Sequence, residues 1–196
     1  GLYNVTISKR VRGEETVLAG PVEFSAKPLG LNSTANTDYD GVTAFRAESG
    51  ELFRAVQGAT RTYRDASDRL KHIRQAVKET PALDTAMFDE VEALTVRLAD
   101  LGVKLNGDRT ISSRSEPTTP SIRSRAGWIF YGVQNNTSGP TQTMRDNLAL
   151  TGRLFAPVLA ELTTLVTVDI KDLENKLEAA GAPYTPGRIP IWKAGD

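Results

Sequence analysis

The first 26 residues alternate between apolar and polar side chains, which is the period of a half-buried β-strand. The apolar members of two such runs, which flank a polar turn at Gly13, are Tyr3, Val5, Ile7, Val22, Phe24 and Ala26. The pattern predicts a β-hairpin within residues 1–30. Because an isolated hairpin is marginally stable in water, we expect it either to pack on helices or to end a β-sandwich whose other strands lie outside this chain. We favour the sandwich.

From residue 39 onward, apolar positions recur every three, four or seven residues, as on one face of an α-helix. The members of this first stripe are Phe45, Leu52, Val56, Ala59, Tyr63, Ala66, Leu70, Ile73 and Val77. A helix over residues 39–79 would be about 60 Å long at a rise of about 1.5 Å per residue. This length favours a bundle or coiled coil, with Thr37 or Asp38 as the N-terminal cap.

A second stripe follows Pro81, which ends the first helix because proline lacks the amide donor that a helix needs. Its members are Met87, Val91, Leu94, Leu98 and Leu101. The pattern stops at Gly102 or at Asn106 and Gly107, residue types that tolerate the positive φ of a helix end. The short connection predicts that the two helices are antiparallel.

The C-terminal half predicts a short helix and a third long helix. The short helix buries Ile122, Ala126, Ile129 and Val133. The long helix runs from residues 141–143 to Ala180, with an inner face of Met144, Leu148, Phe155, Leu159, Leu162, Val166, Leu173 and Leu177. Pro157 is expected to bend it, and Gly181 to end it.

Two polar or proline-rich segments complete the pattern. Residues 108–121 are interpreted as an irregular crossing, and the tail after Gly181 as an extended segment that docks through Ile189, Ile191 and Trp192. The chain is therefore predicted to be mainly α: an antiparallel bundle of three long helices plus one short helix in residues 38–196, with the N-terminal β-hairpin in residues 1–30.

The composition narrows the classes of partner. The 24 Lys and Arg residues balance 24 Asp and Glu residues, so no overall field attracts nucleic acid or anionic lipid. No apolar run approaches the roughly 18 to 20 residues of a membrane span. We expect neither nucleic-acid binding nor membrane insertion. The absence of cysteine excludes disulfides, thiolate catalysis and cysteine-ligated metals.

The sequence offers no catalytic constellation. His72 is the single histidine, and no partner stands at the spacing of a helical metal site. Carboxylate pairs such as Asp65 with Asp68, Asp89 with Glu90, or Glu174 with Glu178 are interpreted as parts of ordinary surface ion pairs. Phosphate-binding glycine loops and nucleophile elbows are missing. We therefore expect no enzyme activity, no catalytic residue, no cofactor and no metal.

One polar and aromatic patch is a candidate binding site. It comprises Arg109, Arg114, Glu116, Arg123 and Arg125, followed by Trp128, Phe130 and Tyr131. Arginine beside exposed aromatic rings suits carbohydrate stacking, carboxylate capture or a protein interface. In the structural alternative, which we favour, the rings cap the end of the bundle while the arginines pair with helix acids.

Several segments carry a resemblance to a known family: GLYNVTISKRVRGEETVLAGPVEFSAKPL, LNGDRT, EPTTPSIRSR, GPTQTMRDNL and LEAAGAPYTPGR. They resemble the C-terminal region of large bacterial proteins called glycosyl hydrolases, which carry sortilin-like BNR-repeat β-propellers. The resemblance implies a secreted, periplasmic or cell-envelope protein with its propellers upstream. It also implies that any glycosidase-type activity belongs to that upstream part, because no catalytic motif falls on these residues.

These observations predict a non-catalytic structural or interaction module at the C-terminal end of a larger protein. Its expected partner is the β-propeller of its own parent chain, with a glycan or another protein as alternatives. The rival hypothesis is a carbohydrate-binding accessory module that uses Trp128, Tyr131 and the nearby arginines. Self-association through a helix face is a third hypothesis.

Overall fold

The computed structural model describes residues 1–27, 38–135 and 138–192. The chain divides into two units, Gly1–Thr37 and Asp38–Asp196. The first carries an antiparallel β-hairpin and the second is helical, so the predicted fold class is confirmed. Thr37 and most of the predicted linker lie outside the described residues.

The hairpin consists of β1 (Leu2–Val11) and β2 (Glu14–Ser25). Arg12 and Gly13 form the turn with φ of 53° and 92°, the positive values that a tight two-residue hairpin turn requires. Tyr3 pairs with Phe24 and Val5 with Val22, so one face of the hairpin is apolar. Every residue of both strands is exposed.

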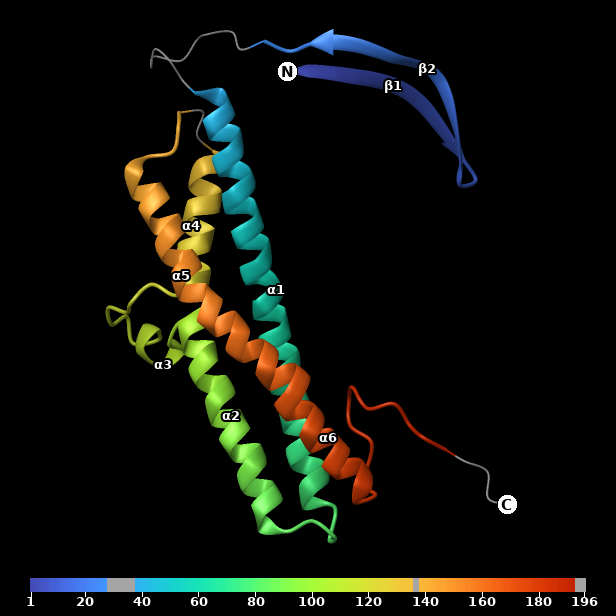
Figure 1. Ribbon diagram of the computed structural model, residues 1–196, viewed down its shortest axis with the longest axis vertical. Helices are drawn as coiled ribbons and strands as arrows, with labels where there is room; N and C mark the ends of the chain where they lie inside the picture. The colour runs from blue at the N-terminus through green and yellow to red at the C-terminus, as the bar shows by residue number, and fades with distance from the viewer. Residues whose placement is uncertain (28–37, 136–137, 193–196) are drawn as a thin grey trace. The chain divides into compact units, whose positions relative to one another are not determined.

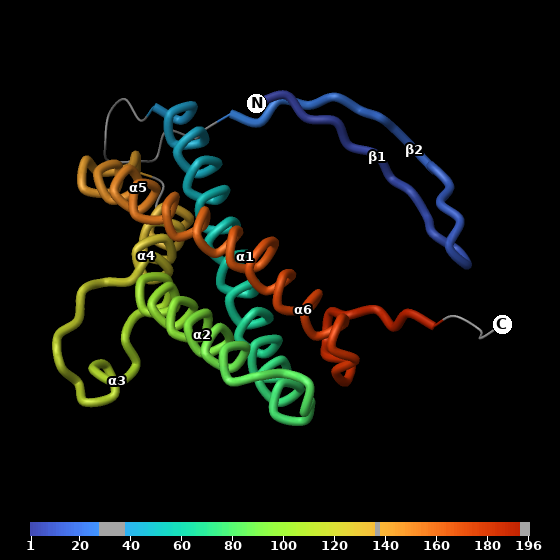
Figure 2. The backbone as a smooth tube through the Cα atoms, turned by 60° about the horizontal axis from the view of Figure 1, so that its bottom comes forward, coloured from blue at the N-terminus to red at the C-terminus, as the bar shows by residue number. Residues whose placement is uncertain are grey.

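The two N-terminal helices of the bundle are α1 (Tyr39–Lys78) and α2 (Thr85–Asn106). They lie side by side and antiparallel (Figures 1 and 2). An Asp38 side-chain oxygen accepts the Gly41 N–H at 2.9 Å and caps α1, and Asp84 caps α2 in the same way. The predicted starts and antiparallel order follow from these caps and the short loop between the helices.

The second half of the bundle contains α4 (Ile122–Gln134), α5 (Gln142–Thr164), the π-helical turn η1 (Leu165–Asp169) and α6 (Ile170–Ala179). The last three form one uninterrupted helical rod that crosses α1, while α4 lies beyond the C-terminal end of α2 and packs against α1 and α5 (Figure 1). Helix α5 continues through Pro157.

The core confirms the stripes predicted for the first, second and short helices. Their members are buried except for Leu52 and Tyr63, which are half-buried and pack against the core. A smaller cluster of Phe45, Ile129, Val133 and Leu148 fills the end of the bundle where α4 packs on α1 and α5. The helical unit thus has a closed apolar core of its own.

The predicted inner face of the third long helix is wrong at one position. Leu159 is exposed, and the adjacent Val158 is buried in its place. Beyond it, Leu165 and Ile170 are both fully buried although they are five residues apart. The π turn between them supplies the extra residue that brings Ile170 back to the core side.

The tail docks through residues other than those predicted. Ile189 and Trp192 are 84% and 83% exposed, whereas Ala182 and Thr185 are buried. The Arg188 side chain, 4% exposed, pairs with Glu178 of α6. The Arg188–Glu178 ion pair and small buried residues therefore hold the tail, and its large apolar side chains are exposed to solvent.

Glu174 corrects the prediction that the carboxylates of α6 form only surface pairs. Its side chain is 1% exposed, and its Oε1 atom accepts a hydrogen bond from Arg69 Nη2 at 2.5 Å. Lys171 Nζ lies 3.6 Å from the other carboxylate oxygen. A Cβ atom at Gly187, where φ is 98°, would lie 3.1 Å from Arg69 Nε, so the tail covers this ion pair directly.

Candidate functional site

The six predicted binding residues do not form one cluster. Arg114 and Glu116 pair with each other at 3.1 Å on the exposed segment before α4, rather than with a helix acid. Arg123 is exposed on α4, one turn before Gly127. Only Arg125 and Trp128 border a common depression, as follows.

Trp128 forms one wall of a depression of about 280 Å³. The ring is 52% exposed. Arg125 lies beside it, where its Nη1 atom donates to Asn147 Oδ1 of α5 at 3.0 Å and its Nε atom donates to the Pro120 carbonyl at 3.3 Å. The depression therefore combines an indole face with a fixed guanidinium and an amide.

Tyr131 belongs to a different aromatic contact. The rings of Phe53 and Phe130 stack with centroids 4.5 Å apart, and Tyr131 meets both edge-on at 5.6 and 5.3 Å. Tyr131 is itself 58% exposed. This group joins α1 to α4, so its packing contributes to the bundle while its outer edge faces solvent.

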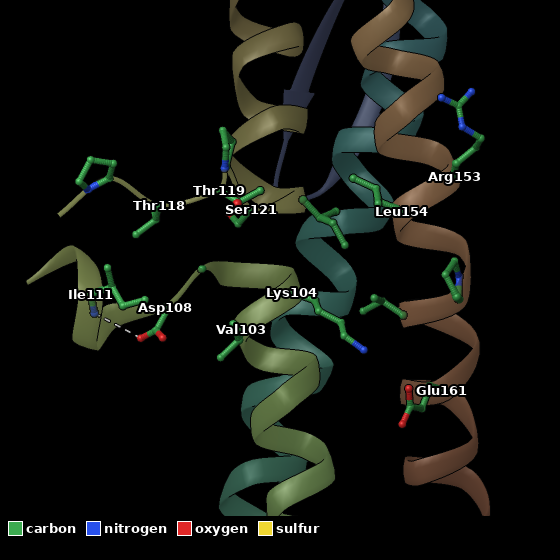
Figure 3. A pocket seen from close by; sticks show the side chains of 16 residues that line it. Val103, Lys104, Asp108, Ile111, Thr118, Thr119, Ser121, Arg153, Leu154 and Glu161 are labelled. Atoms are coloured by element: carbon green, nitrogen blue, oxygen red, sulfur yellow. Dashed lines mark hydrogen bonds between the residues drawn. The ribbon is translucent and has the colours of Figure 1, made fainter.

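A larger pocket, of about 680 Å³, lies between the C-terminal end of α2, residues 107–122 and α5 (Figure 3). Its apolar wall consists of Val103, Ile111, Ile122, Leu154, Pro157 and Val158. Its charged members are Lys104, Asp108, Arg153 and Glu161.

Local sequence signals build the outer wall of this pocket. Gly107 ends α2 with φ of 91°. Asp108 then caps a short helix, α3 (Arg109–Ser112), inside the segment predicted to be irregular. Pro117 and Pro120 keep the chain extended until Ser121 Oγ accepts the Ser124 N–H and caps α4. In Figure 2 this segment loops outward from the helices.

Asp108 is held by three donors. Its Oδ1 atom accepts the Thr110 N–H at 2.8 Å, the Thr110 hydroxyl at 2.6 Å and the Ile111 N–H at 3.4 Å. The Thr110 hydroxyl and N–H are the main causes that lower the pKa of this carboxyl from its ordinary value. The hydrogen bonds of the α3 turn therefore stabilise the charged form of Asp108.

The other charged side chains of the pocket differ in whether they have an ion-pair partner within the protein. Glu161 lies 3.8 Å from Arg97 of α2. Within the described part of the chain, Lys104 and Arg153 take part in no ion pair. Among the described residues these two cations thus have no counter-ion, while Asp108 accepts hydrogen bonds and Glu161 has an ion-pair partner.

The residue pattern of the sequence does not predict this pocket. Its walls come from two stretches that are far apart along the chain, residues 103–122 and 153–161, and no residue pattern within either stretch marks it. The one signal was the length of the polar connection at residues 108–121, since long loops in compact domains usually fold on the surface or serve a function.

Metal binding and membrane crossing can be assessed for the described ranges. Residues 1–27, 38–135 and 138–192 contain no group of three or more His, Cys, Asp or Glu side chains able to hold a metal ion. In the same ranges, no helix combines the length and apolarity that a bilayer crossing demands.

Comparisons with protein-family models, curated proteins and solved structures found no match to this chain.

Proposed function

We propose that this chain is a non-catalytic structural and interaction module, located at the C-terminal end of a larger β-propeller protein of the glycosyl-hydrolase-like type that its sequence resembles. The apolar face of the hairpin, which nothing within the N-terminal unit covers, supports this proposal more than any other observation. We place the parent protein outside the cytosol, in the envelope, the periplasm or the medium.

The hairpin requires a partner for physical reasons. Tyr3, Val5, Val22 and Phe24 share one face, and the Tyr3 and Phe24 rings stack at 5.6 Å. All four are about half exposed or more. Covering side chains of this size contributes about 1.5 to 3 kcal/mol each, and two strands alone are marginally stable. A sheet of the parent chain would supply the missing layer.

The helical unit has no comparable need. Val56, Ile129 and Leu165 are fully buried without any ligand, so the bundle is a stable body. It serves to space or dock the parent protein, while the hairpin attaches to the upstream sheet.

Hydrogen exchange tests this attachment. We expect the amides of β1 and β2 to exchange quickly in this chain alone and to become protected when the parent's upstream β-rich region is added. The Val22→Ser variant should lose the protection, because Val22 is on the apolar face. Glu23→Ser, the adjacent residue of β2 on the opposite face, is the matched control and should keep it. Equal exchange with and without the upstream region would contradict the proposal.

The Trp128 depression supports a second candidate function, carbohydrate binding. An exposed indole beside fixed guanidinium and amide groups matches the stacking and hydrogen bonding by which proteins hold sugars. Arg125 and Asn147 would bind hydroxyl groups while Trp128 stacks on the ring. Tyr131, which packs with Phe53 and Phe130, would contribute only with an extended glycan.

A glycan array combined with tryptophan quenching tests this second candidate. If it is correct, the unmodified chain shows saturable quenching and Trp128→Ala loses binding on the array. Trp192→Ala removes the second tryptophan, which is exposed in the tail, and should leave binding intact. The depression would be ruled out as a sugar site if the unmodified chain bound no glycan on the array. Equal glycan binding by the two variants would rule it out as well.

A further inference from the structure

We propose that the pocket between α2, α5 and residues 107–122 binds a small apolar acid, that is, an aromatic or aliphatic body with a single carboxylate or sulfonate group. The site is distinct from the Trp128 depression, although Pro120 borders both.

The walls fit the apolar part of such a ligand. The volume of about 680 Å³ falls within the range of small-molecule sites, about 300 to 1,000 Å³. Val103 and Leu154 are 48% and 42% exposed here, and Pro157 extends the apolar wall along α5. A ligand that filled the space between α2 and α5 would remove these side chains from water.

The charges select an anion. Figure 3 shows the Lys104 side chain directed from α2 toward α5, across the pocket, while Arg153 leaves α5 and turns away from the pocket centre. Lys104 is therefore the residue placed to pair with an acidic group, and Arg153 adds positive potential at the rim. The Oδ1 atom of Asp108 accepts its cap donors within the α3 turn, so this carboxylate already has local hydrogen-bond partners.

Glu161 limits where an anionic group can lie in the pocket. Its carboxylate lies at the end of the pocket farthest along α5 from Arg153 (Figure 3). Figure 3 shows the tip of the Lys104 side chain directed toward this same part of α5, so an anionic group would pair with Lys104 and stay clear of the Glu161 carboxylate beyond it. The apolar body would then lie between Leu154 and the loop residues Ile111 and Pro117.

Calorimetry with 2-naphthoate and its neutral analogue 2-naphthamide tests the site. We expect saturable one-to-one binding of 2-naphthoate, and affinity about threefold lower for the amide, since one exposed ion pair is lost. Binding should shift the methyl resonances of Ile111 and Leu154 in NMR spectra, which locates the probe independently of the heat.

Four variants separate the contribution of the charge from that of the apolar walls. Lys104→Met should weaken 2-naphthoate about threefold and abolish its advantage over the amide, while Lys104→Arg should retain most of that advantage. Lys78→Met, which removes another exposed lysine from a last helical turn, is the matched control and should bind 2-naphthoate like the unmodified chain. Leu154→Asp should lose both probes, and its melting curve verifies that the bundle is intact.

Two results would overturn the proposal. One is the absence of heat and of methyl shifts with 2-naphthoate at about 1 mM, where even weak sites show occupancy. The other is equal affinity of Lys104→Met and the unmodified chain for 2-naphthoate, which would assign binding to nonspecific apolar contact.

Discussion

At the scale of single residues, the ion pair of Arg69 and Glu174 shows how burial changes the meaning of a charge. The Glu174 side chain is 1% exposed and Arg69 is 23% exposed. A buried carboxylate is tolerated because hydrogen bonds and an opposite charge replace its water. Lys171 and the covering tail at Gly187 complete this environment.

Arg69→Met is expected to reduce the free energy of unfolding by about 3 to 5 kcal/mol, because it leaves a buried charge poorly compensated. Urea unfolding measures this value. Lys71→Met, which breaks the exposed pair with Asp68, is the matched control and should cost about 0 to 1 kcal/mol. If the two variants were equally stable, Glu174 would not be a buried charge.

Asp108 provides a pH dependence at the same scale. Its pKa in the folded chain lies below the ordinary value because Thr110 and Ile111 donate to the charged form. The stabilisation of α3 is therefore complete above the unfolded pKa, about 3.9, and is lost as the pH falls through the lower folded value.

An NMR titration of the Thr110 and Ile111 amides measures this pKa. The midpoint should fall below the ordinary aspartate value, and Asp108→Asn should abolish the transition while the amides keep an acceptor. A midpoint at or above the ordinary value would show that these hydrogen bonds are absent in solution.

At the scale of elements, the rod formed by α5, η1 and α6 contains one more residue than an α-helix would need to keep its apolar face aligned. Val158, Leu162 and Leu165 keep steps of three or four residues, and Ile170 follows after five. The π turn of Leu165–Asp169 accommodates that step. It also places Asp169 2.8 Å from Arg97 of α2.

Deletion of Val168, which is exposed within this turn, should convert it to ordinary α-helix, since Leu165 and Ile170 then stand four residues apart. The melting temperature, followed by circular dichroism, should change by no more than about 5 °C. Deletion of Val96, an exposed valine of α2, turns Leu98 and the residues after it by about 100°. That control should lose cooperative melting, and equal effects of the two deletions would contradict the assignment.

At the scale of the whole molecule, the two units differ in how completely they satisfy their own apolar surface. Among the residues that the structure describes, the buried apolar side chains all lie between Val42 and Ala182, in the helical unit. The hairpin has no buried residue in either strand. The stability of the chain should therefore reside in the helical unit.

Removal of residues 1–37 should leave the melting temperature within about 2 °C of the parent value, as measured by circular dichroism at 222 nm. A peptide of residues 1–27 should show no cooperative transition by itself. A loss of many degrees on truncation would mean that the bundle depends on the hairpin, contrary to its closed core.

The sequence by itself determined the elements of this protein. Alternation predicted the hairpin, and the stripe from Phe45 to Val77 predicted α1 to within a residue, because burying one side of a regular helix fixes the spacing of its apolar residues. Of the two ends that the sequence left open for α2, the structure has the one at Asn106 and Gly107, for an equally local reason, the hydrogen-bonding and backbone needs of helix ends. The family, the location outside the cytosol and the role as a docking module remain predictions.

Only the tertiary structure decided which polar groups are buried and where surfaces meet. Glu174 has the sequence surroundings of a surface residue, and its burial depends on Arg69, 105 positions away. The pocket likewise requires α2, α5 and the loop before α4 to lie together. Such contacts arise from packing between distant segments, and periodicity within one segment carries no information about its neighbour.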